Sequence, residues 1–254
     1  MDVRRYGPWA LIVGGSEGVG RSLAQKLSAS GFKLVLVARK PEPLAELAAE
    51  LSAQGAEVRT VSADMSKPDA LDRVRTATDG LEIGLMVYNA GANSVRGAFV
   101  EIDPEVYRTV IGVNVTNLSE FARHYGGAMR ERERGGIITL GSTAGYLGSP
   151  SLASYCASKA FVRVLSESMW AEGRQFGVDV LHIVIGLTAT PAMARLGYTL
   201  SAAEQPDDVA QLALDNVANG PVLITERNVD SVIAAARITD RAEVVGAMAS
   251  GGRK

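Results

Sequence analysis

The sequence has one cysteine, two histidines and almost no excess of either charge. Because Cys156 is alone, no disulfide can form within the chain, and a reducing compartment such as the cytoplasm is expected. His124 and His182 do not show the spacing of metal ligands, so we predict no metal site. The net charge of −2, from 26 basic and 28 acidic side chains, gives no broad basic surface and argues against a nucleic-acid partner.

Long apolar runs are missing too. No stretch approaches the roughly 20 apolar residues needed to span a bilayer, and the first residues lack the apolar segment of a secretory signal. The hydrophobic residues, 47% of 254, are instead spread along the chain and suffice for a sizeable core. We therefore expect a soluble cytoplasmic protein with no membrane span.

Short apolar runs alternate along the chain with segments of helical spacing. Strands of Leu, Ile and Val that alternate with helices predict a parallel sheet covered on both faces, and right-handed crossovers make it doubly wound. The predicted strands are residues 9–13, 33–38, 57–61, 84–88, 136–140, 178–185 and 221–225. The main predicted helices are residues 21–29, 43–53, 69–77, 119–133 and 152–175. The expected fold class is thus α/β, a single Rossmann-type domain over residues 1–254 with about seven strands.

Residues 205–254 depart from this pattern and form a predicted helix–strand–helix extension. A helix starts at Pro206 with acidic residues in its first turn, and a strand-like run follows at 222–225. Residues 229–248 then have the apolar spacing of one further helix. That helix would cover the protein's own core or contact a second subunit, and the first is the simpler interpretation.

A glycine-rich turn connects the first predicted strand to the first predicted helix. Glycines allow a tight turn and let a pyrophosphate approach the backbone, while the start of the helix offers unpaired N–H groups to phosphates. A glycine cluster alone is equally consistent with an ordinary strand-to-helix turn. Its place at the first strand–helix junction favours a dinucleotide site. The turn contains Gly14, Ser16, Glu17, Gly18, Val19 and Gly20.

The end of the second strand indicates which dinucleotide is bound. An acidic residue there accepts hydrogen bonds from the adenine ribose, whereas an arginine suits a 2′-phosphate. This chain has Arg39, and no acid follows until Glu42. We therefore expect NADP(H) to be favoured over NAD(H), although Arg39 could be an ordinary solvated residue and Glu17 would oppose a second phosphate.

Tyr155 and Lys159 are four residues apart in a predicted helix and so share one face. A nearby ammonium stabilises a phenolate, so Lys159 is expected to lower the pKa of Tyr155 toward the range needed for general acid–base catalysis. Ser142 follows a predicted strand and could donate a hydrogen bond to a substrate oxygen. A Tyr and a Lys at this spacing also occur by chance in many helices, usually as a solvated pair.

Together these residues resemble the short-chain dehydrogenase/reductase family from about residue 9 to residue 190. The resemblance implies a hydride-transferring oxidoreductase with a catalytic tetrad of Asn114, Ser142, Tyr155 and Lys159. Asn114 would anchor a water for proton relay, Tyr155 would be the acid/base, and Lys159 would also hold the ribose. The coenzyme-binding residues that it implies outside the turn are Arg39, Asp64, Met65, Asn89, Ala90, Gly91, Tyr155, Lys159, Gly186, Thr188 and Thr190.

The chain departs from the family pattern at supporting positions. Val13, Tyr88 and Ile185 replace a threonine, an asparagine and a proline. Its ending lacks the glycine-rich strand of many tetrameric members and looks more like that of acyl- and steroid-type ketoreductases. We therefore expect a homodimer, with a tetramer as the alternative.

The leading hypothesis is an NADP(H)-dependent oxidoreductase that interconverts a secondary alcohol and its ketone. A non-catalytic dinucleotide sensor is the alternative, but a sensor would not need Tyr155. An isomerase, dehydratase or epimerase would need a further base, and the loops at 94–97 and 143–150 offer none. An apolar substrate, such as a lipid, steroid or polyketide-like ketone, is suggested by Tyr146, Leu147, Leu152, Met193 and Leu196.

Overall fold

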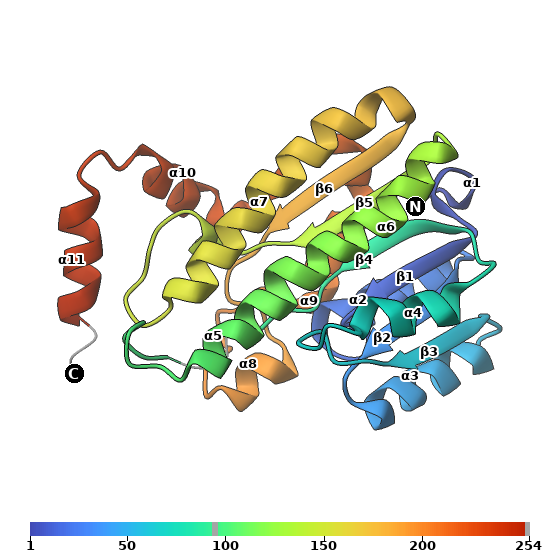
Figure 1. Ribbon diagram of the computed structural model, residues 1–254, viewed down its shortest axis with the longest axis horizontal. Coiled ribbons are helices and arrows are strands. Elements are labelled where there is room, and N and C mark those ends of the chain that lie inside the picture. Colours follow the sequence, from blue (N-terminus) through green and yellow to red (C-terminus); the bar gives the residue numbers. More distant parts are fainter. Residues whose placement is uncertain (93–95, 252–254) are drawn as a thin grey trace.

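The computed structural model describes residues 1–92 and 96–251, and side chains as far as residue 246. Its seven strands form one parallel sheet in the order β3-β2-β1-β4-β5-β6-β7, which confirms the predicted doubly wound fold (Figure 1). The strands are β1 Trp9–Val13, β2 Lys33–Ala38, β3 Val58–Ser62, β4 Ile83–Tyr88, β5 Gly135–Leu140, β6 Val178–Val184 and β7 Val222–Ile224. The helices are α1 Val3–Tyr6, α2 Gly18–Ala29, α3 Pro41–Ala53, α4 Ala70–Thr78, α5 Pro104–Ile111, α6 Asn117–Glu131, α7 Ala153–Gly173, α8 Pro191–Arg195, α9 Pro206–Asp215, α10 Val229–Arg237 and α11 Arg241–Gly251.

The central strands are buried on both faces, which explains why they are apolar without alternation. Successive side chains of a strand point to opposite faces. In β1, Ala10 and Ile12 therefore join one core layer, and Leu11 and Val13 join the other. Helices α2, α3 and α9 supply the first layer, whereas α4, α6 and α7 cover the second, as the two sides of the sheet in Figure 1 show.

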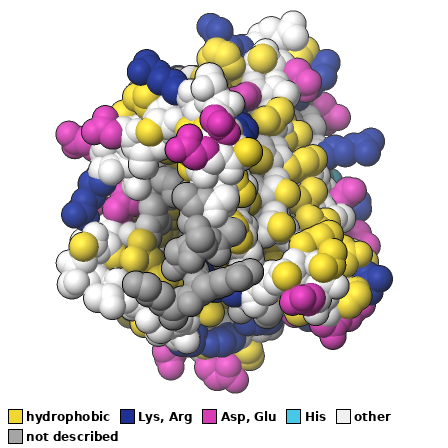
Figure 2. Space-filling view, turned by 90° about the vertical axis from the view of Figure 1, so that its left-hand side faces the viewer, with side chains coloured by type: hydrophobic (Ala, Val, Ile, Leu, Met, Phe, Trp, Pro, Cys, Tyr) yellow, Lys and Arg dark blue, Asp and Glu magenta, His cyan; other side chains and the backbone are white. Residues whose placement is uncertain are grey.

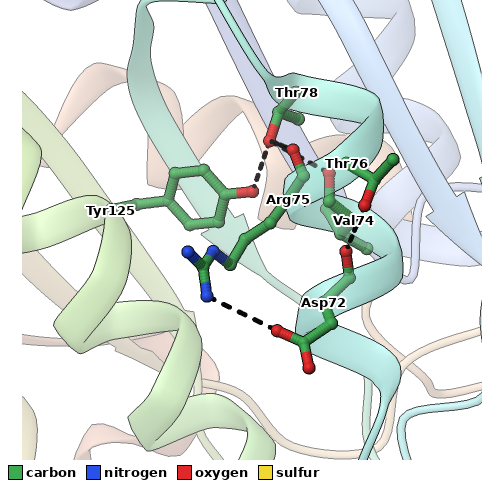
Figure 3. Close-up of polar contacts among 6 residues, drawn as sticks. All are labelled: Asp72, Val74, Arg75, Thr76, Thr78 and Tyr125. Carbon is green, nitrogen blue, oxygen red and sulfur yellow. Dashed lines mark hydrogen bonds and ion pairs between the residues drawn. The ribbon is translucent and has the colours of Figure 1, made fainter.

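Helices α4 and α6 are joined by a buried hydrogen bond between the hydroxyls of Thr78 and Tyr125, 2.9 Å apart (Figure 3). A cavity of about 550 Å³ lies beside this contact and includes Ile83, the first residue of β4. It is therefore at the amino end of the strands, and none of the predicted site residues lines it.

The C-terminal segment differs from the prediction of one helix over 229–248. The structure has two helices, α10 and α11, and the chain at Ile238 is extended. Asp240 accepts a hydrogen bond from the backbone N–H of Glu243, which is the contact of a helix N-cap. The β-branched residues Ile238 and Thr239 directly precede this cap. They favour the start of a new helix, α11, over the continuation of α10. The segment also provides β7, which pairs with β6.

Three short helices, α1, α5 and α8, were absent from the prediction because each is too short to show a clear apolar period. Within the residues that the structure describes, no helix is long and apolar enough to cross a membrane.

Candidate active site

The glycine-rich turn lies at the carboxyl end of β1, held between the two neighbouring strands. The backbone N–H of Gly14 donates to Val37 of β2, and the N–H groups of Asn89 and Ala90 donate to Val13. The Asn89 side chain also donates to the Gly14 carbonyl at 2.7 Å. A Cβ on Gly20 would be 1.9 Å from that carbonyl oxygen, so only glycine lets α2 pack this closely on the turn.

Helix α2 presents its amino end to the same edge of the sheet. Glu17 occupies the N-cap position, but its side chain makes no capping hydrogen bond, and Gly18 follows with φ of +54°. The first N–H groups of the helix are thus left to an external acceptor, and the helix dipole favours an anion. This end of α2 fits a dinucleotide pyrophosphate.

A cavity of about 430 Å³ extends from the turn to the ends of β2 and β3. Burial would raise the pKa of Asp64, but hydrogen bonds from Ser66 and the charges of Arg39 and Lys67 outweigh it and lower that pKa. The structure therefore has an ionised Asp64 near an exposed Arg39. The predicted residues that line this cavity are Gly14, Ser16, Glu17, Arg39, Asp64, Met65, Asn89, Ala90 and Gly91.

A second cavity of about 210 Å³ adjoins the first, because Glu17, Asn89, Gly91, Ala92, Ala192 and Met193 border both. It brings three of the four predicted catalytic residues together with the glycine turn. The predicted residues that line it are Glu17, Gly18, Val19, Asn89, Gly91, Ser142, Tyr155, Lys159, Gly186, Thr188 and Thr190. The glycine turn borders both cavities, Arg39 lines the larger one and Tyr155 the smaller one, an arrangement that fits a nicotinamide dinucleotide.

The pKa values of the tyrosine and the lysine differ from the expectation. Burial raises the pKa of Tyr155, although a hydrogen bond with Ser142 acts in the opposite direction. The Lys159 ammonium is 5.8 Å from the centre of the Tyr155 ring and donates to the Leu140 carbonyl at 2.9 Å. Burial lowers the pKa of Lys159 to about 8. The pKa of Tyr155 is therefore raised overall and not lowered as predicted, because desolvation of the phenol outweighs stabilisation of the phenolate.

Asn114 does not line either cavity but lies just behind them, 1% exposed. It is in a π-helical turn, Gly112–Thr116, which locally widens the helix between α5 and α6. Its side chain accepts from the N–H of Ala92 at 2.9 Å and donates to the carbonyl of the same residue at 3.0 Å. It also donates to Ser158 on α7. Asn114 thus fixes the segment after Gly91 against the helix that carries Tyr155 and Lys159.

The segment after β6 closes the other side of the cavity. The N–H of Gly186 donates to the Glu204 carboxylate at 2.8 Å, and the buried Thr188 hydroxyl donates to the carbonyl of Gly186. Thr190 caps α8 by accepting from the N–H of Met193. Of the coenzyme-binding residues predicted from the sequence, Gly20 alone lines neither cavity, since it faces the Gly14 carbonyl inside the turn.

The residues predicted to contact an apolar substrate are divided among several cavities. Met193 borders both coenzyme cavities, and Leu196 borders the larger one. Leu152 lies in a small apolar cavity on the other side of Tyr155, with Ile102 and Val106. Tyr146 and Leu147 line a separate cavity next to α11. Of the loop at 94–97, residues 94 and 95 lie outside the described residues.

Two charged residues of the site did not enter the predicted set. Lys40 directly follows Arg39 and lines the larger cavity, so its position in the sequence could have identified it. Arg195 reaches the same cavity from α8, and no local pattern marks it. Among residues 1–92 and 96–251 there is no group of three or more His, Cys, Asp or Glu side chains that could hold a metal ion.

The chain is similar to proteins of one family along most of its length. A family model described as short chain dehydrogenase matches residues 8–200. The 7beta-hydroxysteroid dehydrogenase of Collinsella aerofaciens is 36% identical over 216 residues, which are 84% of this chain and 81% of the relative. The very-long-chain 3-oxoacyl-CoA reductase of Neurospora crassa is 34% identical over 224 residues, which are 85% of this chain and 67% of that protein.

Solved structures show the same relationship. A structure from work on 7beta-hydroxysteroid dehydrogenase stereoselectivity superimposes with a TM-score of 0.90 at 32% identity, covering 97% of this chain and 98% of the other. A short-chain dehydrogenase from Sphingobium yanoikuyae in complex with NADPH gives 0.80 at 28% identity, covering 96% and 94%. The chain therefore belongs to the short-chain dehydrogenase/reductase family and is an NAD(P)-dependent oxidoreductase that acts on hydroxyl and keto groups.

Proposed function

We propose that this protein is an NADP(H)-dependent oxidoreductase that interconverts a secondary alcohol and its ketone on an apolar substrate. The observation that carries the proposal is the shared cavity in which Ser142, Tyr155 and Lys159 meet the glycine turn. Its relatives are named dehydrogenases and reductases, which favours turnover over the alternative of a non-catalytic sensor.

In this proposal Tyr155 is the acid and base, and its raised pKa suits the protonated form at neutral pH. In ketone reduction its phenol donates a proton to the carbonyl oxygen, while the Ser142 hydroxyl donates a hydrogen bond to the same oxygen. The nicotinamide, when bound, supplies the hydride or accepts it. Lys159, held by the Leu140 carbonyl, stabilises the phenolate that forms, and Asn114 positions the segment opposite these groups.

The preference for NADP(H) rests on charge at the end of β2. Arg39 and Lys40 both line the larger cavity, and a guanidinium can bind a phosphate through two parallel hydrogen bonds. Similar structures include one in complex with NADPH and, at 25% identity, a reductase from Brucella melitensis with bound NAD. The residues of this chain favour the first of these coenzymes.

The apolar substrate is supported from two directions. The cavity beside Tyr155 is small, about 20 Å³, and offers an apolar surface next to the phenol, which includes Ile102, Val106 and Leu152. The relatives from Collinsella aerofaciens and Clostridium sardiniense are named for a hydroxysteroid substrate. We therefore propose a hydroxysteroid, or a ketone of comparable size and polarity, as the substrate class.

Titration with NADPH and NADH, followed by nicotinamide fluorescence, tests the coenzyme part of the proposal. The wild type should bind NADPH more tightly, and Arg39→Ala should remove the preference while NADH binding is kept. A panel of hydroxysteroids and bulky ketones then tests the substrate class. Tyr155→Phe should lower kcat by about 10²- to 10⁴-fold with unchanged NADPH affinity. If the wild type binds neither coenzyme, the proposal is wrong.

We also propose that residues 1–254 form one domain and that two copies form a homodimer. The first proposal is supported by β7, which joins the C-terminal segment to the common sheet. The second is supported by apolar side chains on α7, where Phe161 and Val164 are 44% and 51% exposed. Figure 2 shows that the end of the molecule near α11 also has hydrophobic side chains gathered on part of its surface.

A further inference from the structure

An ion pair in the wall of the larger cavity joins two segments far apart in the sequence. The Arg195 guanidinium of α8 donates to one carboxylate oxygen of Glu17 in the glycine turn, at 2.6 Å. The ammonium of Lys40 is 3.8 Å from the other oxygen. All three side chains line the larger cavity. The Glu17 carboxylate thus lies between two cations, and one of them, Lys40, directly follows Arg39 in the sequence.

Helix α8 is short and mostly exposed at this point. It has only five residues, and Pro191, Ala192, Ala194 and Arg195 are exposed. Its amino end contacts the turn through Thr190, whose Cγ2 would be 2.8 Å from a Cβ on Gly18. Beyond its carboxyl end, Arg96 donates to the Tyr198 hydroxyl. Between these two contacts, the pair of Glu17 and Arg195, which we call the Glu17–Arg195 clasp, ties α8 to the glycine turn.

Helix α8 also borders both parts of the coenzyme space, because Ala192 and Met193 line the smaller and the larger cavity. A dinucleotide in that space therefore lies beside the Glu17–Arg195 clasp. A phosphate monoester carries a charge of about −1.5 to −2 at pH 7, whereas a carboxylate carries −1. Arg195 and Lys40 should consequently favour the phosphate when both anions compete for them.

We propose that the 2′-phosphate of the coenzyme opens the Glu17–Arg195 clasp by replacing the Glu17 carboxylate as the partner of Arg195 and Lys40. Arg195 is then a specificity-determining residue for the coenzyme, and Glu17 is an internal competitor of the phosphate. This inference rests on the proposed use of NADP(H). It gives α8, through Arg195, a part in recognising the coenzyme in addition to that of Arg39.

Binding measurements on the full chain test this without any assay of turnover. NADPH and NADH are titrated by nicotinamide fluorescence, and 2′,5′-ADP and 5′-AMP by calorimetry. The variants are Glu17→Gln, Arg195→Gln and the double variant, with Arg39→Ala as a reference. Glu172→Gln and Arg73→Gln make the same charge changes at exposed positions that line neither coenzyme cavity. Thermal melting confirms that each variant folds.

Glu17→Gln should tighten NADPH and 2′,5′-ADP by about threefold to tenfold, because the competing charge is removed. Arg195→Gln should weaken the same two ligands by a similar factor, and in the double variant the gain from Glu17→Gln should disappear. NADH, 5′-AMP and the two charge controls should change by less than about twofold.

The outcomes separate this inference from the proposed function. If Arg39→Ala removes a clear NADPH preference but the Glu17 and Arg195 variants bind like the wild type, the clasp proposal is wrong and the coenzyme proposal stands. If the wild type shows no NADPH preference and Glu17→Gln creates one, the clasp proposal is supported and the coenzyme proposal fails. Equal tightening of NADH and NADPH by Glu17→Gln would also overturn the role of the 2′-phosphate.

Discussion

His182 of β6 provides a quantitative test of the buried layer beneath the active site. It is 1% exposed, and its Nδ1 is 2.8 Å from the Thr139 hydroxyl, which in turn is 2.9 Å from the Ser166 hydroxyl. A Cβ on Gly141 would be 2.2 Å from Nε2, so the ring lies directly against the residue before Ser142. Burial and the charges of Lys159 and Arg163 lower the pKa of His182 to about 3.

This lowered pKa makes the stability of the fold depend on pH. The ordinary pKa of histidine is 6.5, so between pH 6.5 and pH 3 the unfolded chain binds the proton and the folded chain does not. The stabilisation is complete above pH 6.5 and is lost as the pH falls. A pH of 5 is about 1.5 units below the pKa of the histidine in the unfolded chain. The free energy of unfolding at pH 5 is therefore lower by about 2 kcal/mol. This figure stays nearly the same as long as the folded pKa is below about 4.

Urea unfolding at pH 7 and pH 5, followed by far-UV circular dichroism, measures the effect. In the wild type the free energy of unfolding includes this loss together with those of all other titrating groups. In His182→Asn, which can keep the contact with Thr139, the decrease from pH 7 to pH 5 should be smaller by about 2 kcal/mol. His124→Gln is the comparison, because His124 is exposed on α6, and its pKa is also lowered, by partial burial and the charge of Arg75, so this variant should reduce the decrease by less than His182→Asn does. Equal decreases in the wild type and His182→Asn would show that His182 does not remain neutral in the fold.

Gly20→Ala places a Cβ 1.9 Å from the Gly14 carbonyl oxygen. It should lower the free energy of unfolding by about 1–3 kcal/mol and weaken NADPH binding. Gly127→Ala, where the structure leaves open space on α6, should instead raise the free energy of unfolding by up to about 1 kcal/mol. Both are measured by urea unfolding, and a stable, tightly binding Gly20→Ala protein would contradict the packing of α2 on the turn. Because burial lowers the pKa of Lys159 to about 8, kcat/KM for ketone reduction should fall as the pH rises through about 8. In Lys159→Arg, whose charge persists, this fall should be absent, and an unchanged profile would assign it to another group.

The sheet and the position of the site were predictable because both depend on local patterns. Buried parallel strands are continuous apolar runs, and ligands of such sheets bind at the carboxyl ends of the strands. The sequence pattern alone therefore places Gly14 after β1, Arg39 after β2 and Ser142 after β5 at one edge of the sheet. The boundary between α10 and α11 was missed, since a cap at Asp240 interrupts an apolar spacing that continues across it.

The pKa values of the site residues depend on burial and on partners distant in the sequence. The spacing of residues in the sequence does not predict either of these. The interval of four residues placed Tyr155 and Lys159 on one helix, but the carbonyl that binds the ammonium belongs to Leu140 on β5. Burial then moved both pKa values in the directions that disfavour charge, upward for the phenol and downward for the ammonium. A prediction from the sequence treated the pair as if only their mutual attraction counted.

Glu17 shows the same difference between position and environment. In the sequence it is an acid within a phosphate-binding turn, where it appears only to oppose the phosphate. In the structure it accepts a hydrogen bond from Arg195, 178 residues away, and that partner also faces the cavity. An acid that holds a cation beside an anion site lowers the affinity for the anion, because the ion pair must be broken before the cation can bind the anion. The effect of Glu17 on coenzyme affinity therefore depends on Arg195, and the two residues must be varied together to measure it.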